Sequence, residues 1–141
     1  MTHVVQAALF VALLAGCSGN DLEVVPVRGQ ITYGGGAWPE SGWIFFTPVE
    51  PAAGLPDRPG HAHFDTSGHF QVTSFQENDG LVPGQYRAAV ECWHEVPTME
   101  DPMAGVSYVP KPFQSPQTSG LEVTIEPGQE RVDILWDIPK Q

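Results

Sequence analysis

The chain has 141 residues and carries 17 acidic and 6 basic side chains, which gives a formal net charge of −11 at pH 7. A chain this acidic repels phosphate backbones and anionic headgroups, so the composition argues against a nucleic-acid-binding protein. Its 14 prolines and 15 glycines would interrupt long helices, and its length suits a single domain.

An apolar segment near the start of the chain runs from Val4 to Ala15 and is interrupted only by Gln6. It is shorter than the roughly 20 apolar residues that a helix needs to span a bilayer. Its length is instead typical of the core of a signal peptide, which ends at small residues where a peptidase cleaves. The sequence therefore predicts export from the cytoplasm.

The residues that end this segment, Leu14-Ala15-Gly16-Cys17, resemble the lipobox of bacterial lipoproteins. The resemblance implies that the thiol of Cys17 receives a diacylglyceryl group and that the chain is cleaved just before this residue. A thiol is the side-chain nucleophile most readily converted into a stable thioether. We therefore expect a signal peptide over residues 1–16 and a lipidated Cys17 that begins a short tether over residues 17–23.

This interpretation places the protein in the bacterial cell envelope, anchored by lipid to a membrane on the extracytoplasmic side. Each buried methylene contributes about 0.8 kcal/mol, so two or more acyl chains hold a protein on a membrane far more firmly than one. The membrane is then the first partner, and envelope proteins or glycans are candidate further partners. An uncleaved anchor and a plain secretion signal are the alternatives.

Beyond Asp21 the chain predicts β-strands throughout. Short runs of Val, Ile, Phe, Tyr and Thr alternate with turn residues, and no segment sustains the apolar spacing of a helix. The expected strands cover residues 24–33, 42–47, 61–65, 69–74, 85–95, 121–126 and 131–138. Short strands separated by frequent turns are typical of an all-β fold, here a seven-stranded antiparallel β-sandwich of immunoglobulin-like type.

One hairpin can be specified in more detail. The connection Thr66-Ser67-Gly68 suits a three-residue turn with Gly68 in the left-handed conformation. The resulting register places Phe64 opposite Phe70 on the inner face. Asp65 and His69 then face each other on the outer face.

Several segments in a fixed order carry a family resemblance. They are Val27-x-Gly29-x-Ile31-Thr32-Tyr33, Gly42-x-Ile44-x-Phe46-x-Pro48, Asp65-x-x-Gly68-x-Phe70, Asp79-Gly80-Leu81-x-Pro83-Gly84-x-Tyr86, Tyr108-x-Pro110-Lys111-Pro112-Phe113 and Thr118-Ser119-Gly120-Leu121-x-Val123. Their order and spacing resemble the carboxypeptidase-regulatory-domain-like, or transthyretin-like, module of small bacterial lipoproteins. The resemblance covers nearly all of residues 24–138 and implies a transthyretin-like sandwich over that range.

The resemblance implies a module without catalytic activity, because in the carboxypeptidases this domain is accessory. The sequence agrees, since a zinc carboxypeptidase site needs His-x-x-Glu and no His here has a Glu three residues later. A Gly-x-Ser-x-Gly elbow and a phosphate-binding Gly loop are also absent from the sequence. We expect a structural or binding module that is not an enzyme and needs no cofactor.

Four side chains of the predicted hairpin are candidate metal ligands: His61, His63, Asp65 and His69. Side chains two apart on a strand share a face, and the register brings His69 beside Asp65, so the four could converge on the outer surface. Zinc or copper would accept such ligands. The alternative is a solvated polar strand face, which would hold no metal.

Aromatic residues are the second hint of a binding role. Trp38, Trp43, Trp93, Tyr108 and Phe113 cannot all be placed in the core by alternation. A Trp in the loops of a sandwich can contact a sugar or a protein, which makes carbohydrate or protein recognition the alternative function. Burial of these residues under the long loops is the competing interpretation. The connection over residues 96–119 is longer than most structureless loops, which is typical of a binding loop.

Cys92 is the remaining thiol if Cys17 is lipidated, so the domain has no internal disulfide. We expect Cys92 to be a small buried residue of a strand. A catalytic thiol would need an adjacent base, and His94 is the local candidate.

Overall fold

The computed structural model describes residues 21–141, so the predicted signal peptide and Cys17 lie outside the described residues. In the described range the backbone forms strands and one short 3-10 helix, η1 (Lys111–Gln114), but no α-helix. No helix in this range has the length and apolar character to cross a membrane. The all-β prediction is therefore confirmed.

All seven predicted segments contain a strand. The strands are β1 (Val27–Tyr33), β2 (Gly42–Pro51), β3 (Gly60–Phe64), β4 (His69–Gln71), β5 (Gly84–Glu91), β6 (Trp93–Glu95), β7 (Val106–Ser107), β8 (Glu122–Ile125) and β9 (Val132–Ile138).

The strand predicted over residues 85–95 is interrupted at Cys92. The pairing of β5 with β2 ends where Glu91 lies opposite Trp43, next to the start of β2 at Gly42. Beyond that point β2 offers no further partner. The chain therefore leaves the main sheet as β6 and pairs with β7, a strand within the predicted 96–119 connection.

The main sheet has seven strands in the order β8-β5-β2-β3-β4-β1-β9. Its neighbours are antiparallel except β1 and β9, which run parallel from Val27 opposite Val132 to Tyr33 opposite Ile138. The expectation of a wholly antiparallel arrangement is wrong for this pair. The turn after β8 carries the chain to the far edge of the sheet, where it joins β1 instead of closing a hairpin with β8.

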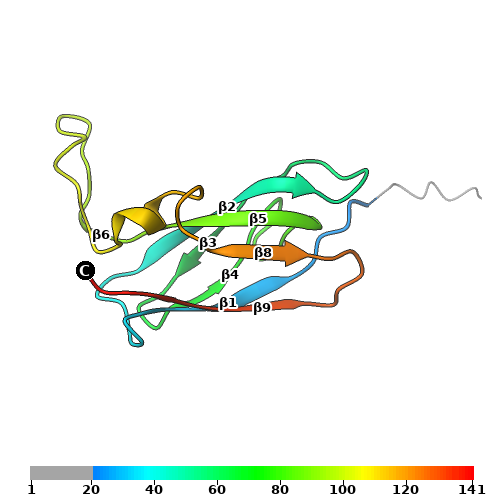
Figure 1. The fold of residues 1–141 in the computed structure, drawn as a ribbon, viewed down its shortest axis with the longest axis horizontal. Coiled ribbons are helices and arrows are strands. Elements are labelled where there is room, and N and C mark those ends of the chain that lie inside the picture. Colours follow the sequence, from blue (N-terminus) through cyan, green and yellow to red (C-terminus); the bar gives the residue numbers. More distant parts are fainter. Residues whose placement is uncertain (1–20) are drawn as a thin grey trace, which may run out of the picture.

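The continuous sheet curls until its two halves face each other across one core, with β2, β5 and β8 on one side and β1 and β9 on the other (Figure 1). Phe46 of β2 stacks on Trp136 of β9 with ring centroids 6.0 Å apart, so the two halves touch. The core contains large side chains from most strands and from the loops: Ile31, Ile44, Phe46, Phe64, Val72, Leu81, Val90, Ile125 and Ile138.

The predicted β3–β4 hairpin has the expected register. Phe64 pairs with Phe70, and both side chains are buried. Gly68 has φ +85° and accepts a hydrogen bond from the backbone N–H of Ile31 on β1. The turn therefore reverses the chain and also attaches the hairpin to β1.

Asp79 organises the loop between β4 and β5. Its carboxylate accepts hydrogen bonds from the backbone N–H groups of Ser74, Phe75 and Gln76 at 2.8, 3.1 and 2.9 Å. Partial burial alone would raise the pKa of Asp79, but these backbone donors together outweigh that effect and lower the pKa below its ordinary value. The carboxylate thus stabilises the folded state in its charged form.

Replacing Asp79 by Asn is expected to destabilise the domain by about 1–3 kcal/mol at pH 7, because an amide supplies one acceptor oxygen where the carboxylate supplies two. A depressed folded pKa gives stability that is present above the unfolded value of about 3.9 and lost as the pH falls through the folded pKa. Urea unfolding should therefore show that the difference in free energy of unfolding between the wild type and Asp79→Asn becomes smaller from pH 7 to about pH 3. Asp57→Asn, at an exposed position, serves as the control. An Asp79→Asn deficit that does not change with pH would contradict this role.

Candidate functional site

The outer faces of β2 and β3 bring an aromatic residue beside two histidines. Alternation directs Trp43 outward on β2 and both His61 and His63 outward on β3. Trp43 pairs directly with His63, and its ring lies 5.0 Å from that imidazole and 5.9 Å from the imidazole of His61, measured between centroids. The indole keeps 43% of its surface exposed. It is thus fixed in position and still accessible.

This aromatic residue lies at one side of a groove with a volume of about 930 Å³. The groove crosses the outer face of β2, β3, β4, β1 and β9, and is lined by residues from each of these strands. On β4 and β1 the outward side chains include Gln71 and Gln30, and on β9 they include Leu135. Gln30 donates to the backbone carbonyl of Ser67 at 3.0 Å. The floor is therefore the sheet itself, which is a rigid support.

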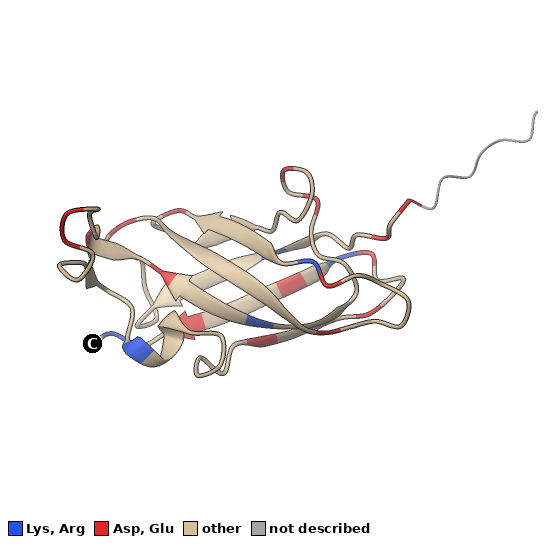
Figure 2. Ribbon diagram, turned by 90° about the horizontal axis from the view of Figure 1, so that it is seen from above, with Lys and Arg blue, Asp and Glu red and all other residues tan. Residues whose placement is uncertain are grey.

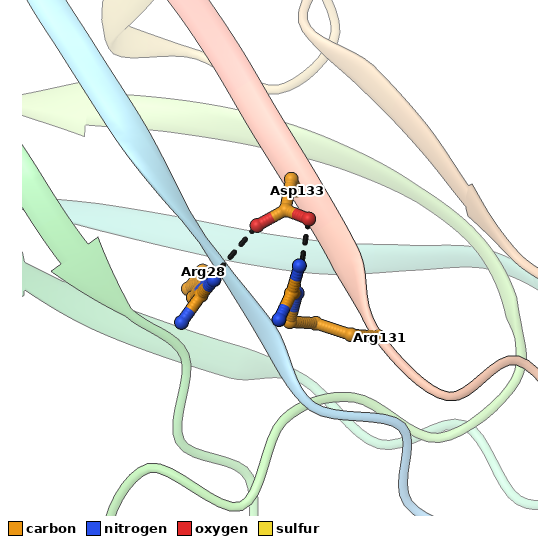
Figure 3. Close-up of polar contacts among 3 residues, drawn as sticks. All are labelled: Arg28, Arg131 and Asp133. Atoms are coloured by element: carbon orange, nitrogen blue, oxygen red, sulfur yellow. Dashed lines mark hydrogen bonds and ion pairs between the residues drawn. The ribbon is translucent and has the colours of Figure 1, made fainter.

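Arg28 of β1 and Asp133 of β9 line the groove and belong to an ion-pair network (Figure 3). Asp133 accepts from Nε of Arg28 and from Nε of Arg131, each at 3.0 Å. The hydrogen bond from Arg28, followed by that from Arg131, lowers the pKa of Asp133. These groups are well exposed, so the network adds little stability, and its two guanidinium groups outnumber its single carboxylate.

The β3–β4 turn holds three polar side chains in contact. The Ser67 hydroxyl donates to Oδ1 of Asp65 at 2.5 Å and lies 2.7 Å from Nδ1 of His69. The hydroxyl of Ser67, and to a smaller extent the backbone N–H of His69, lowers the pKa of Asp65. Ser67 was not among the predicted site residues. Because Asp65 contacts the hydroxyl and not the imidazole, the three do not form the Ser-His-Asp relay of a hydrolase. They hold the turn together.

The four predicted metal ligands are divided between these two places. His61 and His63 flank Trp43, whereas Asp65 and His69 belong to the turn network. Within residues 21–141, no group of three or more His, Cys, Asp or Glu side chains is placed to hold a metal ion. The register thus brings His69 to Asp65 as expected, but it does not bring the four ligands to one point.

Trp38 is a core residue, which corrects its assignment as a ligand contact. Only 3% of its surface is exposed, and its indole N–H donates to the carbonyl of Ile31 at 2.8 Å. Its ring stacks on Tyr33 and packs against Phe64, with centroid distances of 4.7 and 4.9 Å. The loop after β1 folds this side chain inward, so it offers no face to a ligand.

The other predicted aromatic contacts lie outside the groove lining. Trp93, Tyr108 and Phe113 are half-buried, and the hydroxyl of Tyr108 lies 2.9 Å from Nδ1 of His94. Tyr33 donates to the backbone carbonyl of Tyr108 at 3.0 Å. The predicted aromatic residues therefore do not form one platform, and Trp43 is the member that lines the groove.

Cys92 is buried, as expected, although it lies between β5 and β6 and not within a strand, and its thiol donates to the backbone carbonyls of Glu40 and Ser41. Burial raises the pKa of Cys92 to about 11, and this effect outweighs the hydrogen bond to the Glu40 carbonyl. His94 contacts Tyr108 instead of the thiol. Cys92 therefore lacks the thiolate character of a reactive cysteine.

We expect Cys92 in the folded protein to resist alkylation by iodoacetamide at pH 8, because the thiol is both buried and protonated. After unfolding in urea it should react as a normal thiol. Mass spectrometry of the tryptic peptide that contains Cys92 measures both rates. Rapid labelling of the native protein would contradict this assignment.

No family model matches the chain, and no curated protein or solved structure was found to be similar to it.

Proposed function

We propose that the protein is a lipid-anchored module of the bacterial cell envelope, tethered through Cys17 on the extracytoplasmic side of a membrane and acting by binding, without catalysis. The groove with the exposed indole of Trp43 carries the binding part of this proposal. A concave surface with one aromatic anchor and several convergent polar groups is the usual form of a ligand site. The lipobox-like residues supply the anchor.

The same proposal includes the transthyretin-like assignment of residues 24–138. Its support is the agreement of the turn residues with their expected places, above all the left-handed Gly68 and the buried pair Phe64 and Phe70. The two facing halves of the sheet are compatible with a sandwich-like arrangement. The parallel pairing of β1 with β9 is the feature in which this domain departs from a purely antiparallel sandwich.

Detergent phase partition of the full-length protein, expressed in a bacterium, tests the anchor. The wild type and Cys92→Ala are expected to enter the detergent phase, since both keep Cys17. Cys17→Ser is expected to be found in the aqueous phase or to keep its leader. If Cys17→Ser enters the detergent phase with the same mature mass as the wild type, the lipid anchor at this residue is refuted.

Protein recognition is a second candidate function, and the β6–β7 hairpin favours it. This hairpin projects away from the main sheet (Figure 1), and its loop exposes Met99 and Met103 at 96% and 91%. Exposed methionines are common on surfaces that bind proteins. Oxidative footprinting should then show both methionines protected in intact cells and oxidised in the purified protein. Equal oxidation in the two preparations would exclude this role.

A further inference from the structure

The groove contains a continuous row of outward side chains, one from each of its five strands. Trp43 lies opposite His63, and Arg28 lies opposite both Gln71 and Asp133. The pairing of Phe64 with Phe70 and of His61 with Thr73 places His63 opposite Gln71. The cross-strand row is therefore Trp43, His63, Gln71, Arg28 and Asp133.

We infer that the cross-strand row binds a neutral oligosaccharide, with a sugar ring stacked on Trp43. The inference rests on the proposed function, because it names the ligand class of the same groove. Neighbouring strands lie about 4.8 Å apart, so four intervals give the row a length of roughly 19 Å. A chain of several linked sugars can follow a row of this length, whereas a small metabolite would contact only part of it.

The Trp43 end of the row suits the apolar face of a sugar ring. An aromatic ring has a negative face, which attracts the weakly positive C–H groups that a pyranose presents on one side. The imidazoles of His61 and His63, on the neighbouring strand β3, contact the indole and limit its movement. A platform that is already fixed loses little conformational entropy when a ligand stacks on it.

The middle and far end of the row suit sugar hydroxyls. The imidazole of His63 and the amide of Gln71 both offer donors and acceptors, which matches a hydroxyl that donates and accepts. Arg28 and Asp133 are held in a fixed pair, so the guanidinium presents donors and the carboxylate acceptors in known positions. A row that offers both donors and acceptors on rigid strands is suited to a polyhydroxyl chain.

Charge favours a neutral ligand. The row itself contains one positive and one negative side chain, Arg28 and Asp133, which are paired with each other. Elsewhere on the domain acidic residues outnumber basic ones (Figure 2), and this excess repels anionic polymers. A cationic ligand would find few partners in the groove. Glu77 is the one carboxylate of the groove lining besides Asp133, and Asp133 is already bound by two arginines.

An extended peptide fits the groove less well than a sugar chain. Peptides that bind to sheets usually add a strand at a free edge, where backbone groups are unpaired. The groove lies on the face of the sheet, and the backbone beneath it is paired between β2 and β3, β4 and β1, and β1 and β9. Contacts there must come from side chains, which is the usual situation for a sugar.

The test measures retention of the full-length protein, held in detergent micelles, on an array of immobilised neutral and acidic oligosaccharides. The wild type is expected to bind one or more neutral glucans, mannans or chito-oligosaccharides. Trp43→Ala and Gln71→Ala should weaken this retention by about tenfold or more, as for the few residues that carry most of the binding energy of an interface. Both side chains face outward from the sheet, so neither change disturbs the core.

Two matched controls lie outside the groove. Trp93→Ala removes an indole of β6, within the β6–β7 hairpin, and Gln85→Ala removes an outward glutamine of β5. Both variants should bind like the wild type. Retention on acidic glycans alone, no retention on any neutral glycan, or equal loss in the control variants would overturn the inference. The anchor would be unaffected by any of these results, because detergent partition of Cys17→Ser tests it separately.

Discussion

Gly68→Ala is expected to destabilise the domain far more than Gly128→Ala, although both residues have a left-handed backbone, with φ values of +85° and +81°. A Cβ atom at Gly68 would lie 1.8 Å from the carbonyl oxygen of Ile31, whereas a Cβ at Gly128 would meet nothing within 4 Å. The Ile31 backbone cannot move away freely, because its N–H is bonded to Gly68 and its carbonyl accepts from Trp38.

The two variants separate the conformational effect from the steric one. Gly128→Ala should lose about 1–2 kcal/mol, the usual amount for a left-handed residue with a side chain. Gly68→Ala should lose more than about 4 kcal/mol, since the turn must also separate from β1. Urea unfolding followed by circular dichroism measures both. Equal losses at the two glycines would show that the turn does not pack against β1 as described.

Phe64→Ala is expected to give the largest loss of stability among single core truncations of the β3–β4 hairpin, about 3–5 kcal/mol. Phe64 is fully buried, and its ring packs against Trp38 with centroids 4.9 Å apart. It also fills the space beside Gly42, where a Cβ would lie 2.3 Å from Cζ of Phe64. Removing the ring leaves a cavity that the surrounding strands cannot close without separating.

Phe45→Ala is the matched control, because Phe45 lies on the outer face of β2 and is 39% exposed. Its loss should stay below about 1.5 kcal/mol, since part of the ring is already in water. Thermal unfolding of the two variants compares them directly. A Phe64→Ala protein as stable as Phe45→Ala would contradict the inward register of the hairpin.

Local sequence signals were sufficient for the strands and for this hairpin. Alternation with a period of two residues directs Phe64 and Phe70 inward and His61 and His63 outward, and this depends only on neighbours in the chain. The position of Gly68 likewise follows from turn chemistry, because few other residues adopt a positive φ without strain.

Strand order could not be predicted in the same way. The parallel pairing of β1 with β9 joins segments about a hundred residues apart. The alternation of apolar and polar residues in β9 would be the same whether this strand paired with β1 or with β8, so it does not identify the partner. The groove depends on that order, because Arg28 and Asp133 meet only when β9 lies beside β1. The burial of Trp38 could not be predicted for the same reason. Its position in a loop suggested exposure, but it is buried by Tyr33 of β1 and Phe64 of β3, whose places around it depend on the tertiary fold.

The intact mass of the full-length protein, extracted from the membranes of the bacterium that expresses it, tests the lipid anchor at Cys17 most directly. We expect a mature chain that begins at Cys17 and carries the added mass of a diacylglyceryl thioether, with Cys92 unmodified. A chain that retains residues 1–16, or one that begins elsewhere without lipid, would contradict it.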